Sequence, residues 1–405
     1  MELVAAKYKK TELGLIPEDW NLVEFQEVMD GFSSGQTPYR GNPEFYRGDI
    51  PWITSGELNY NVITDTKEKI NIEGVQDANL KTIPKGTFLF AITGLEAAGT
   101  RGSCAITGID ATTNQSCMAL YPKKGLLTTP YLYHFYVRYG NELAFKYCQG
   151  TKQQSFTGGI AKKLPIIIPP TIEEQTAIAT VLSDTDALID SLEKLIDKKR
   201  NIKQGAMQKL LQPKEGWQSK KLSEIGEIIT GGTPPTITQE YWNGSIPWIT
   251  PTDISIEKDI FHSEREISEA GLNVLRKLPA NTLLVTCIAS IGKNAILRKR
   301  GACNQQINAI VPNQENDVDF LYYLIENNKQ YILSKAGITA TLLISKRDFS
   351  EIIFSFPNKK EEQTHIATIL SDMDAEINAF EIKLEKYRNV KSGMSQTLLT
   401  GKIRI

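Results

Sequence analysis

The sequence predicts a mixed α/β (α+β) fold of two similar globular domains, separated by two long antiparallel helices that form a pseudo-twofold symmetric coiled coil. Three observations lead to this expectation. Motifs occur twice in the same order, a long helical segment also occurs twice, and the remaining sequence mixes strand-like with helical runs. A chain of 405 residues also exceeds one ordinary core, so two domains are expected.

The repeated motifs cover most of the chain. The segment Ile-Pro-Trp-Ile-Thr at residues 50–54 recurs at 246–250, and Gly-Gln-Thr-Pro at 35–38 corresponds to Gly-Gly-Thr-Pro at 231–234. Other matched positions lie in the same order: Phe45-Tyr46 with Tyr241-Trp242, Trp20 with Trp217, and Asn114-Gln115 with Asn304-Gln305. Each half therefore contains one globular block.

The helical segments match most closely. Residues 173–211 align without gaps on residues 361–399, and more than half of the positions are identical. Apolar residues recur at alternating steps of three and four, and Thr171 with Glu173 and Glu174 suits a helix start. About 40 residues at 1.5 Å each give a rod of roughly 60 Å. Each apolar stripe needs a partner, and the simplest partner is the other helix.

These patterns predict two globular domains, residues 1–171 and 213–359, and two helical segments, residues 172–212 and 360–405. Within the domains, residues 87–93, 160–168 and 283–289 are expected to form strands, and residues 132–137 and 321–325 helices. Long polar loops rich in glycine and proline precede the Ile-Pro-Trp-Ile-Thr strands, and such loops often carry recognition residues.

Charge alone does not point to nucleic acid. The chain holds 46 Lys and Arg against 47 Asp and Glu, a net charge of −1, and the charges also cancel within each globular block. DNA-binding modules usually carry a basic excess. Composition otherwise suits a soluble protein: five cysteines without a CxxC motif indicate reduced thiols in the cytoplasm, and neither a membrane span nor a signal peptide is expected.

Together, these repeats resemble the DNA-specificity subunits of type I restriction–modification systems. The most specific elements are the Glu-Glu-Gln-Thr-x-Ile-Ala-Thr-x-Leu-Ser-Asp helix starts at residues 173–184 and 361–372, supported by the Thr-Pro and Ile-Pro-Trp-Ile-Thr segments. The resemblance covers residues 11–405. It implies that each globular block is a target-recognition domain for one half of a bipartite double-stranded DNA site. It further implies that the helices set the spacer and dock two methyltransferase subunits, and that restriction/translocase subunits join the complex.

Candidate DNA contacts are the polar side chains of the loops. Arginine can bond guanine with two hydrogen bonds, glutamine can bond adenine, and lysine can hold phosphate. For any single residue, a solvated charge on a turn is the more common situation. In the first domain the candidates are Thr37, Tyr39, Arg40, Arg47, Arg101, Lys152, Gln153, Gln154 and Ser155. In the second they are Thr233, Thr236, Lys293, Arg298, Lys299, Arg300, Thr339, Lys346 and Arg347. The repeated Asn-Gln pairs follow strand-like runs, so we expect them to be buried structural amides.

No catalytic, metal or cofactor site is expected. The sequence has no GxxxxGK[ST] loop, no Asn/Asp-Pro-Pro-Tyr/Phe pocket for a flipped base, and no histidine at metal-ligand spacing from a cysteine or carboxylate. The main interpretation is a non-catalytic specificity subunit. Two alternatives stay open: a self-contained restriction endonuclease, and a coiled-coil scaffold that does not bind DNA. A scaffold gives no reason for the two globular blocks to diverge so far.

Overall fold

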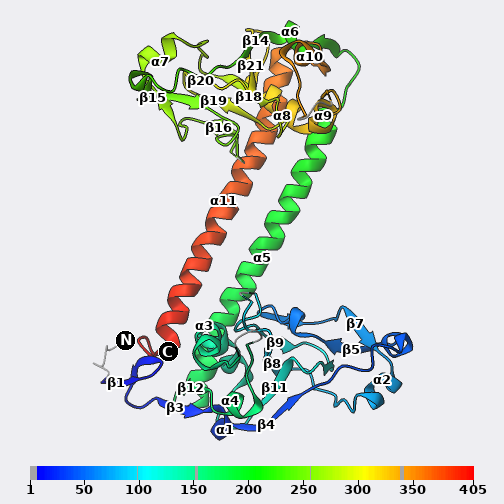
Figure 1. The fold of residues 1–405 in the computed structure, drawn as a ribbon, viewed down its shortest axis with the longest axis vertical. Coiled ribbons are helices and arrows are strands. Elements are labelled where there is room, and N and C mark those ends of the chain that lie inside the picture. Colours follow the sequence, from blue (N-terminus) through cyan, green and yellow to red (C-terminus); the bar gives the residue numbers. More distant parts are fainter. Residues whose placement is uncertain (1–6, 98, 151–153, 256, 338–341) are drawn as a thin grey trace. The chain divides into compact units, whose positions relative to one another are not determined.

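The computed structural model describes residues 7–97, 99–150, 154–255, 257–337 and 342–405. The chain divides into two compact units, one of Met1–Leu192 with Lys383–Ile405 and the other of Glu193–Ile382. Each unit contains one mixed α/β domain and a part of each of two 39-residue helices, α5 (Ile172–Leu210) and α11 (Lys360–Leu398) (Figure 1).

The domain of the first unit is built from short strands with helices between them. Its elements in chain order are β1 (Tyr8–Thr11), β2 (Gly14–Pro17), β3 (Asn21–Glu24), α1 (Phe25–Val28), β4 (Met29–Ser34), η1 (Pro43–Tyr46), β5 (Ile50–Ile53), η2 (Ser55–Glu57), β6 (Asn61–Ile63), β7 (Glu68–Ile70), α2 (Ile72–Asp77), β8 (Phe88–Ala91), β9 (Cys104–Thr107), β10 (Thr112–Thr113), β11 (Cys117–Pro122), α3 (Thr129–Tyr147), α4 (Gly158–Lys162) and β12 (Pro165–Ile168).

The domain of the second unit repeats this order from β3 onward, except that it has no counterpart of η2 among its described residues and contains one additional short helix, α9. Its elements are β13 (Gln218–Lys221), α6 (Leu222–Ile225), β14 (Gly226–Thr230), η3 (Gln239–Tyr241), β15 (Trp242–Ile249), β16 (Asp259–Ile260), β17 (Glu266–Ile267), α7 (Glu269–Asn273), β18 (Thr282–Thr286), β19 (Asn294–Leu297), β20 (Ala302–Cys303), β21 (Ile307–Pro312), α8 (Val318–Asn327), α9 (Lys329–Leu333), α10 (Lys346–Ser350) and β22 (Ile353–Phe356).

The two domains share one sheet topology. A five-stranded sheet has the order β4-β11-β8-β9-β6 in the first domain and β14-β21-β18-β19-β16 in the second. A three-stranded sheet has the order β10-β5-β7 and, correspondingly, β20-β15-β17. Even the parallel pairs correspond, because β5 runs parallel to β10 as β15 does to β20. The helix α3 packs on β8 and β9, and α8 packs on β18 and β19.

The long helices close the core of each domain at matched positions. In the first unit, Ile178 and Leu182 of α5 and Leu398 at the end of α11 are buried in the domain core. In the second unit, Ile366 and Leu370 of α11 are buried in the same way. Burial of a large aliphatic side chain contributes about 1.5–3 kcal/mol, which explains why these matched positions are apolar in both helices.

A buried glutamine fixes each domain to its helix. The Gln175 side chain accepts a hydrogen bond from the Thr128 backbone N–H at 3.0 Å and donates one to the Leu126 carbonyl at 2.9 Å. Gln363 likewise accepts from the Asp317 backbone N–H at 3.0 Å. Thr128 and Asp317 are the N-cap residues of α3 and α8, so both contacts fix the start of the equivalent helix.

Ion pairs between α5 and α11 show that the helices run antiparallel within each unit. In the second unit, Lys199 pairs with Glu376 at 2.6 Å, whereas Lys203, one turn later, pairs with the earlier residue Asp374. In the first unit, Lys391 pairs with Asp186. The predicted fold class, two similar mixed α/β domains with two long antiparallel helices, is confirmed.

One local prediction is wrong. Residues 160–168 were expected to form a single strand, but β12 begins at Pro165, and α4 occupies Gly158–Lys162. The side chain of Thr157 accepts a hydrogen bond from the Ile160 backbone N–H at 3.2 Å and so caps this helix. A local cap therefore outweighs the apolar pattern of the first part of the segment.

All five cysteines are free, and burial raises the pKa of the Cys287 and Cys303 thiols to about 12. Among the described residues, no helix combines the length and apolar character that a membrane span requires.

Candidate nucleic-acid interface

A glycine in close contact with the backbone begins the candidate interface in each domain. A Cβ atom added to Gly35 would lie 1.6 Å from the Thr113 carbonyl oxygen, and one added to Gly231 would lie 2.1 Å from that of Cys303. Only glycine permits such an approach. The repeated Gly-x-Thr-Pro motif therefore holds its loop directly against β10 or β20.

The tryptophan of the Ile-Pro-Trp-Ile-Thr strand fixes the same loop. The indole N–H of Trp52 donates to the Gln36 carbonyl at 3.1 Å, and that of Trp248 donates to the Gly232 carbonyl at 2.9 Å. Both tryptophans are buried, so these hydrogen bonds also satisfy their only polar atom. The two motifs that recur in the sequence thus bind to each other in each domain.

The Asn-Gln turn joins the two sheets of the first domain. The backbone N–H of Asn114 donates to the carbonyl of Ile53, at the end of β5, at 2.9 Å. The carbonyl of Ser116 accepts from the backbone N–H of Ile92, directly after β8, at 2.9 Å. The side chain of Asn114 accepts from the Ser116 backbone N–H at 3.0 Å and stabilises the turn.

The second domain repeats this turn. Asn304 donates its backbone N–H to the Ile249 carbonyl at 2.8 Å, and the Gln306 carbonyl accepts from the Cys287 backbone N–H at 2.8 Å. The Asn304 side chain is 7% exposed and accepts from the Gln306 backbone N–H at 3.0 Å. The prediction of a structural amide is confirmed for Asn304, while its counterpart Asn114 is half-buried.

The glutamines of these turns do not fit the same prediction. Gln115 and Gln305 are exposed, and each accepts a hydrogen bond from the threonine of the Gly-x-Thr-Pro loop. The distance is 2.7 Å from Thr37 to Gln115 and 2.8 Å from Thr233 to Gln305. Their adjacency to a strand-like run suggested burial, but the turn rotates the second residue outward. Each domain therefore presents an exposed glutamine that is bonded to this threonine, which is half-buried at Thr37 and exposed at Thr233. The two threonines were predicted as candidate contacts from the sequence, whereas the two glutamines were not.

A further loop reaches the same region of each domain. The backbone N–H of Phe156 donates to the Ile92 carbonyl at 2.8 Å, and that of Ile344 donates to the Cys287 carbonyl at 3.0 Å. The Asn-Gln turn, the loop after β8 or β18 and the segment before α4 or α10 are consequently held together by backbone hydrogen bonds. In each domain we call these segments, together with the threonine–glutamine pair, the Asn-Gln cluster.

The predicted residues before β5 differ in their contacts. Tyr39 is 70% exposed, and its backbone N–H donates to Asp77 at 2.9 Å. Arg47 is exposed and pairs with Glu44 one turn earlier at 2.8 Å. Such surface pairs contribute little to stability, so the Arg47 guanidinium stays available to a ligand.

Arg101 and the segment before α4 lie together. The Arg101 guanidinium donates to the carbonyls of Leu95 at 2.8 Å and Glu96 at 3.2 Å, so it stabilises its own loop. Leu95 donates its backbone N–H to the carbonyl of Gln154. Gln154 and Ser155 are half-buried there. Lys152 and Gln153 lie outside the described residues.

Four predicted residues of the second domain are exposed. Thr236 follows the Gly-x-Thr-Pro loop, Lys293 precedes β19, and Lys346 and Arg347 form the first turn of α10. None of the four has a side-chain partner among the described residues. Thr339 lies outside the described residues.

Arg298 is tied into its own domain. Its Nε atom lies 2.6 Å from Asp259, and its Nη2 atom lies 2.6 Å from Asp319. A third hydrogen bond, at 2.9 Å, reaches the side chain of Asn281. With its donors used in this way, Arg298 has the contacts of a structural residue.

The next two basic residues are exposed. The ammonium of Lys299 lies 3.4 Å from the His262 ring, and Arg300 pairs with Glu269 at the start of α7. Both side chains can exchange these surface contacts for contacts with a ligand.

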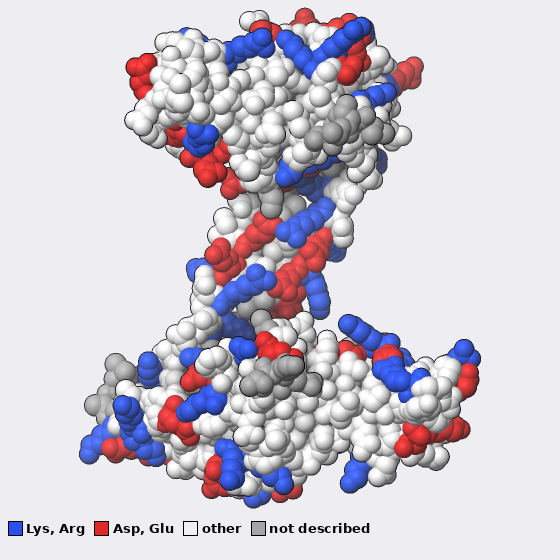
Figure 2. Space-filling model, in the orientation of Figure 1, with Lys and Arg blue, Asp and Glu red and all other residues white. Residues whose placement is uncertain are grey.

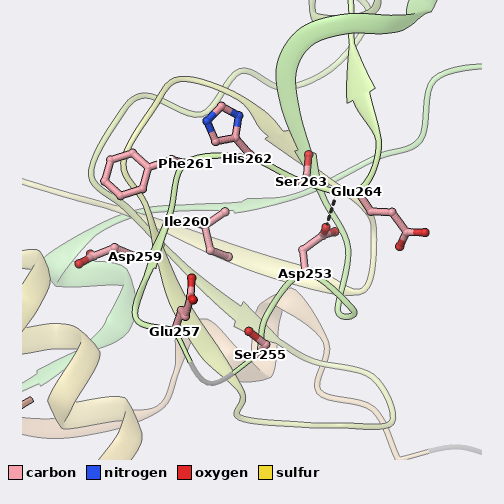
Figure 3. Close-up of a pocket in the computed structure, with 9 residues that line it drawn as sticks. All are labelled: Asp253, Ser255, Glu257, Asp259, Ile260, Phe261, His262, Ser263 and Glu264. Carbon is pink, nitrogen blue, oxygen red and sulfur yellow. Dashed lines mark hydrogen bonds between the residues drawn. The ribbon is translucent and has the colours of Figure 1, made fainter. Parts of the chain in front are cut away.

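An acidic pocket in the second domain is a poor match for DNA. Asp253, Glu257, Asp259 and Glu264 line a cavity of about 340 Å³, and Asp253 accepts a hydrogen bond from the Glu264 backbone N–H at 2.8 Å (Figure 3). Carboxylates repel phosphate. Within the described part of the chain, no set of three or more His, Cys, Asp and Glu side chains is arranged to hold a metal ion.

The charges on the surface are mixed. On the face drawn in Figure 2, lysine and arginine side chains alternate with carboxylates over both domains and along the helices. No broad basic field appears on that face, in agreement with the net charge of −1. Specific contacts rather than a general attraction would have to hold DNA here.

A duplicated α/β domain that presents the same cluster twice is typical of a protein that binds a target with two parts. The family model described as Type I restriction modification DNA specificity domain matches residues 17–201 and 214–386, which is most of the chain. The chain belongs to this family of type I restriction–modification specificity subunits, and the predicted resemblance is confirmed.

Relatives and solved structures agree. The type I restriction enzyme MjaIX specificity subunit of Methanocaldococcus jannaschii is 36% identical over 168 residues, which cover 40% of this chain and 38% of that subunit. The putative MjaX specificity subunit of the same organism is 28% identical over 98% of this chain and 97% of its own. The S subunit of a type I system from M. genitalium has a TM-score of 0.60 at 16% identity, covering 94% of this chain and 96% of its own.

Proposed function

We propose that this chain selects the DNA site of a type I restriction–modification complex and catalyses no step itself. Residues 1–171 and 213–359 act as target-recognition domains, and each reads one half of a bipartite double-stranded site. Residues 172–212 and 360–405 set the unread spacer and dock two methyltransferase subunits. Restriction/translocase subunits join through the complex, which acts in the cytoplasm.

The observation that carries this proposal is the matched cluster around the Asn-Gln turn. Thr37 with Gln115 and Thr233 with Gln305 repeat one geometry, while the loops around them differ in sequence and in length. A constant pair suits a contact that every site offers, such as a phosphate, whereas variable loops suit base recognition. The residues that we assign to DNA are the half-buried Thr37 and the exposed Tyr39, Arg47, Gln115, Thr233, Thr236, Lys293, Lys299, Arg300, Gln305, Lys346 and Arg347.

The mixed surface charge supports the need for partners. Neutralising phosphates supplies most of the non-specific affinity for DNA, and this chain offers no basic excess. We therefore expect weak binding by the isolated chain and strong binding by the complex with two methyltransferase subunits. The mass of the reconstituted complex tests the stoichiometry, and a stable one-to-one assembly would contradict it.

Gel-shift assays with and without the methyltransferase test the function. The complex should shift a DNA that carries its methylated motif and should shift an unrelated DNA far less. Gln115→Ala and Gln305→Ala should each weaken binding to every sequence by a similar factor. Gln76→Ala on the exposed end of α2 is the matched control and should leave binding unchanged.

The alternatives give different results. A scaffold would shift no DNA in either assay. A self-contained endonuclease would cleave DNA when the purified chain is incubated alone with a divalent cation.

A further inference from the structure

Arg265 lies over a pair of tryptophans in the second domain. Its guanidinium carbon is 3.8 Å from the ring centre of Trp242 and 5.1 Å from that of Trp248. The two rings are nearly perpendicular, with centres 5.1 Å apart. The Arg265 side chain is exposed, and it immediately precedes β17. Stacking on an aromatic face holds the guanidinium plane and leaves its N–H edge free to donate.

The first domain also stacks a guanidinium on the equivalent aromatic pair. Arg40 lies 4.2 Å from the ring centre of Tyr46 and 5.1 Å from that of Trp52. Arg40 comes from the loop before β5, however, and not from the edge of β7. In the second domain, Thr236 takes the place of Arg40 after the Thr-Pro motif.

The sheet register shows where Arg265 has its counterpart. Trp52 is paired with Glu68 of β7, and the backbone N–H of Trp248 donates to the Arg265 carbonyl at 3.3 Å. Arg265 and Glu68 therefore occupy equivalent positions beside the tryptophan. The two domains place a guanidinium over the same rings from two different backbone positions.

The two guanidiniums differ in what they leave free. Glu68 accepts two hydrogen bonds from the Nη1 and Nη2 atoms of Arg40, at 2.6 and 2.8 Å, so both ends of this guanidinium are occupied. Arg265 has no carboxylate partner among the described residues. The neighbourhood is otherwise matched, since Trp248 bonds to Gly232, the residue before Thr233 of the exposed pair.

We propose that Arg265 is a base-reading residue of the second domain, which donates two hydrogen bonds to a guanine edge in its half of the DNA site. This inference rests on the proposed function. A contact with phosphate would be expected in both domains, as the threonine–glutamine pair is. The guanidinium N–H donors are free in the second domain and occupied in the first. This difference suits a contact that differs between the two half-sites.

The experiment compares methylated motifs in cells that express the complete system with Arg265→Lys, Arg265→Ala or the unaltered chain. The second half-site of the unaltered complex should contain a guanine whose discrimination falls roughly ten- to hundredfold in both variants. The first half-site and the spacer should stay the same. Arg276→Lys, an exposed arginine of the same unit, is the matched control.

Other results overturn the inference. An unchanged methylated motif would do so. An equal loss of binding affinity for all DNA sequences, with a salt dependence of binding reduced by about one charge, would also do so, because it marks a phosphate contact. Circular dichroism checks that both variants fold. If Arg265→Ala does not fold, the result for Arg265→Lys alone decides whether the inference holds. Failure of the unaltered complex to bind any DNA would instead refute the proposed function, and this inference with it.

Discussion

Lys203 of α5 forms an ion pair with Asp374 of α11, and the equivalent residues of the two helical repeats, Lys391 and Asp186, form the same pair. In both pairs, the lysine of one repeat meets the aspartate of the other. Such reciprocity is the pattern of a self-complementary contact. Asp374 also accepts a hydrogen bond from Tyr323 at 2.6 Å, so this pair connects the helices with α8.

The first prediction concerns this ion pair. Lys203→Glu should lower the free energy of unfolding of the second unit by about 0.5–1.5 kcal/mol, since both side chains are partly exposed. Asp374→Lys in the same chain should restore part of the loss. A double-mutant cycle by chemical denaturation measures the coupling. A coupling of zero would show that the pair is a passive surface contact.

The second prediction concerns Arg40. The adjacent Glu68 carboxylate raises the pKa of Arg40, and Arg40 in turn lowers the pKa of Glu68. Glu68→Gln should free the guanidinium and strengthen non-specific DNA binding by the complex a few-fold, with a salt dependence steeper by about one charge. Glu142→Gln, at an exposed position of α3, changes the net charge equally and is the control. Equal effects of both substitutions would exclude a specific role for Arg40.

The third prediction concerns spacer length. Four residues inserted after Leu195 and four after Lys383 should lengthen each helix by about 6 Å. This is nearly two base pairs at about 3.4 Å each, so the unread spacer should grow by one or two pairs. Both half-sites should stay the same because no recognition loop changes. Methylome sequencing before and after the insertion gives the result, and an altered half-site would refute the division of roles.

The fourth prediction concerns exchange of a domain. Replacement of residues 213–359 by the block of another family member should change one half-site and leave the spacer and the other half unchanged. The same methylome readout applies. A change in both halves would show that the two domains do not read DNA independently.

The fifth prediction concerns pH. His134 of α3 is buried against α5, where its ring lies 2.8 Å from the Ser183 hydroxyl. Burial, with a smaller effect of Lys391, lowers the pKa of His134 to about 4 from 6.5. Below pH 6.5 the unfolded chain binds a proton that the folded chain excludes. Stability should therefore fall as the pH drops from 6.5 towards 4, by roughly 3 kcal/mol for this group.

The measurement is the unfolding free energy of the first unit against pH. His134→Gln should flatten the curve between pH 6.5 and 4. His365→Gln, which removes an exposed histidine, should leave the curve as it is. An unaltered slope in His134→Gln would show that other groups cause the pH dependence.

Repetition made the fold predictable from the sequence. Two matched apolar stripes require partners of equal length, and the duplicated motifs require duplicated domains. Local conformation was harder to predict from the sequence, because the Thr157 side chain caps α4 in a segment whose apolar pattern is typical of a strand. The same limit applies to Gln115, whose outward direction depends on a turn that two sheets hold in place.

Among the arginines, sequence could not separate structural from available side chains. The partners of Arg298 are 39 and 21 residues away, at Asp259 and Asp319, so nothing near it in the chain indicates its ion pairs. The stacking of Arg265 could not be predicted, because Trp242 and Trp248 lie far from it in the sequence. Only the pairing of β15 with β17 brings them together.

The contacts of Gln175 and Gln363 have an evolutionary consequence. Gln175 binds the backbone N–H of Thr128 and the carbonyl of Leu126, and Gln363 binds the backbone N–H of Asp317. These backbone contacts impose no residue type on the partner, although the Gln363 amide also donates to the side chain of Asn316 at 3.4 Å. A foreign α/β block that supplies the same turn can therefore join the helix without a compensating mutation. Under the proposed function, recombination at the helix ends is a single-step route to a new pairing of two inherited half-site preferences.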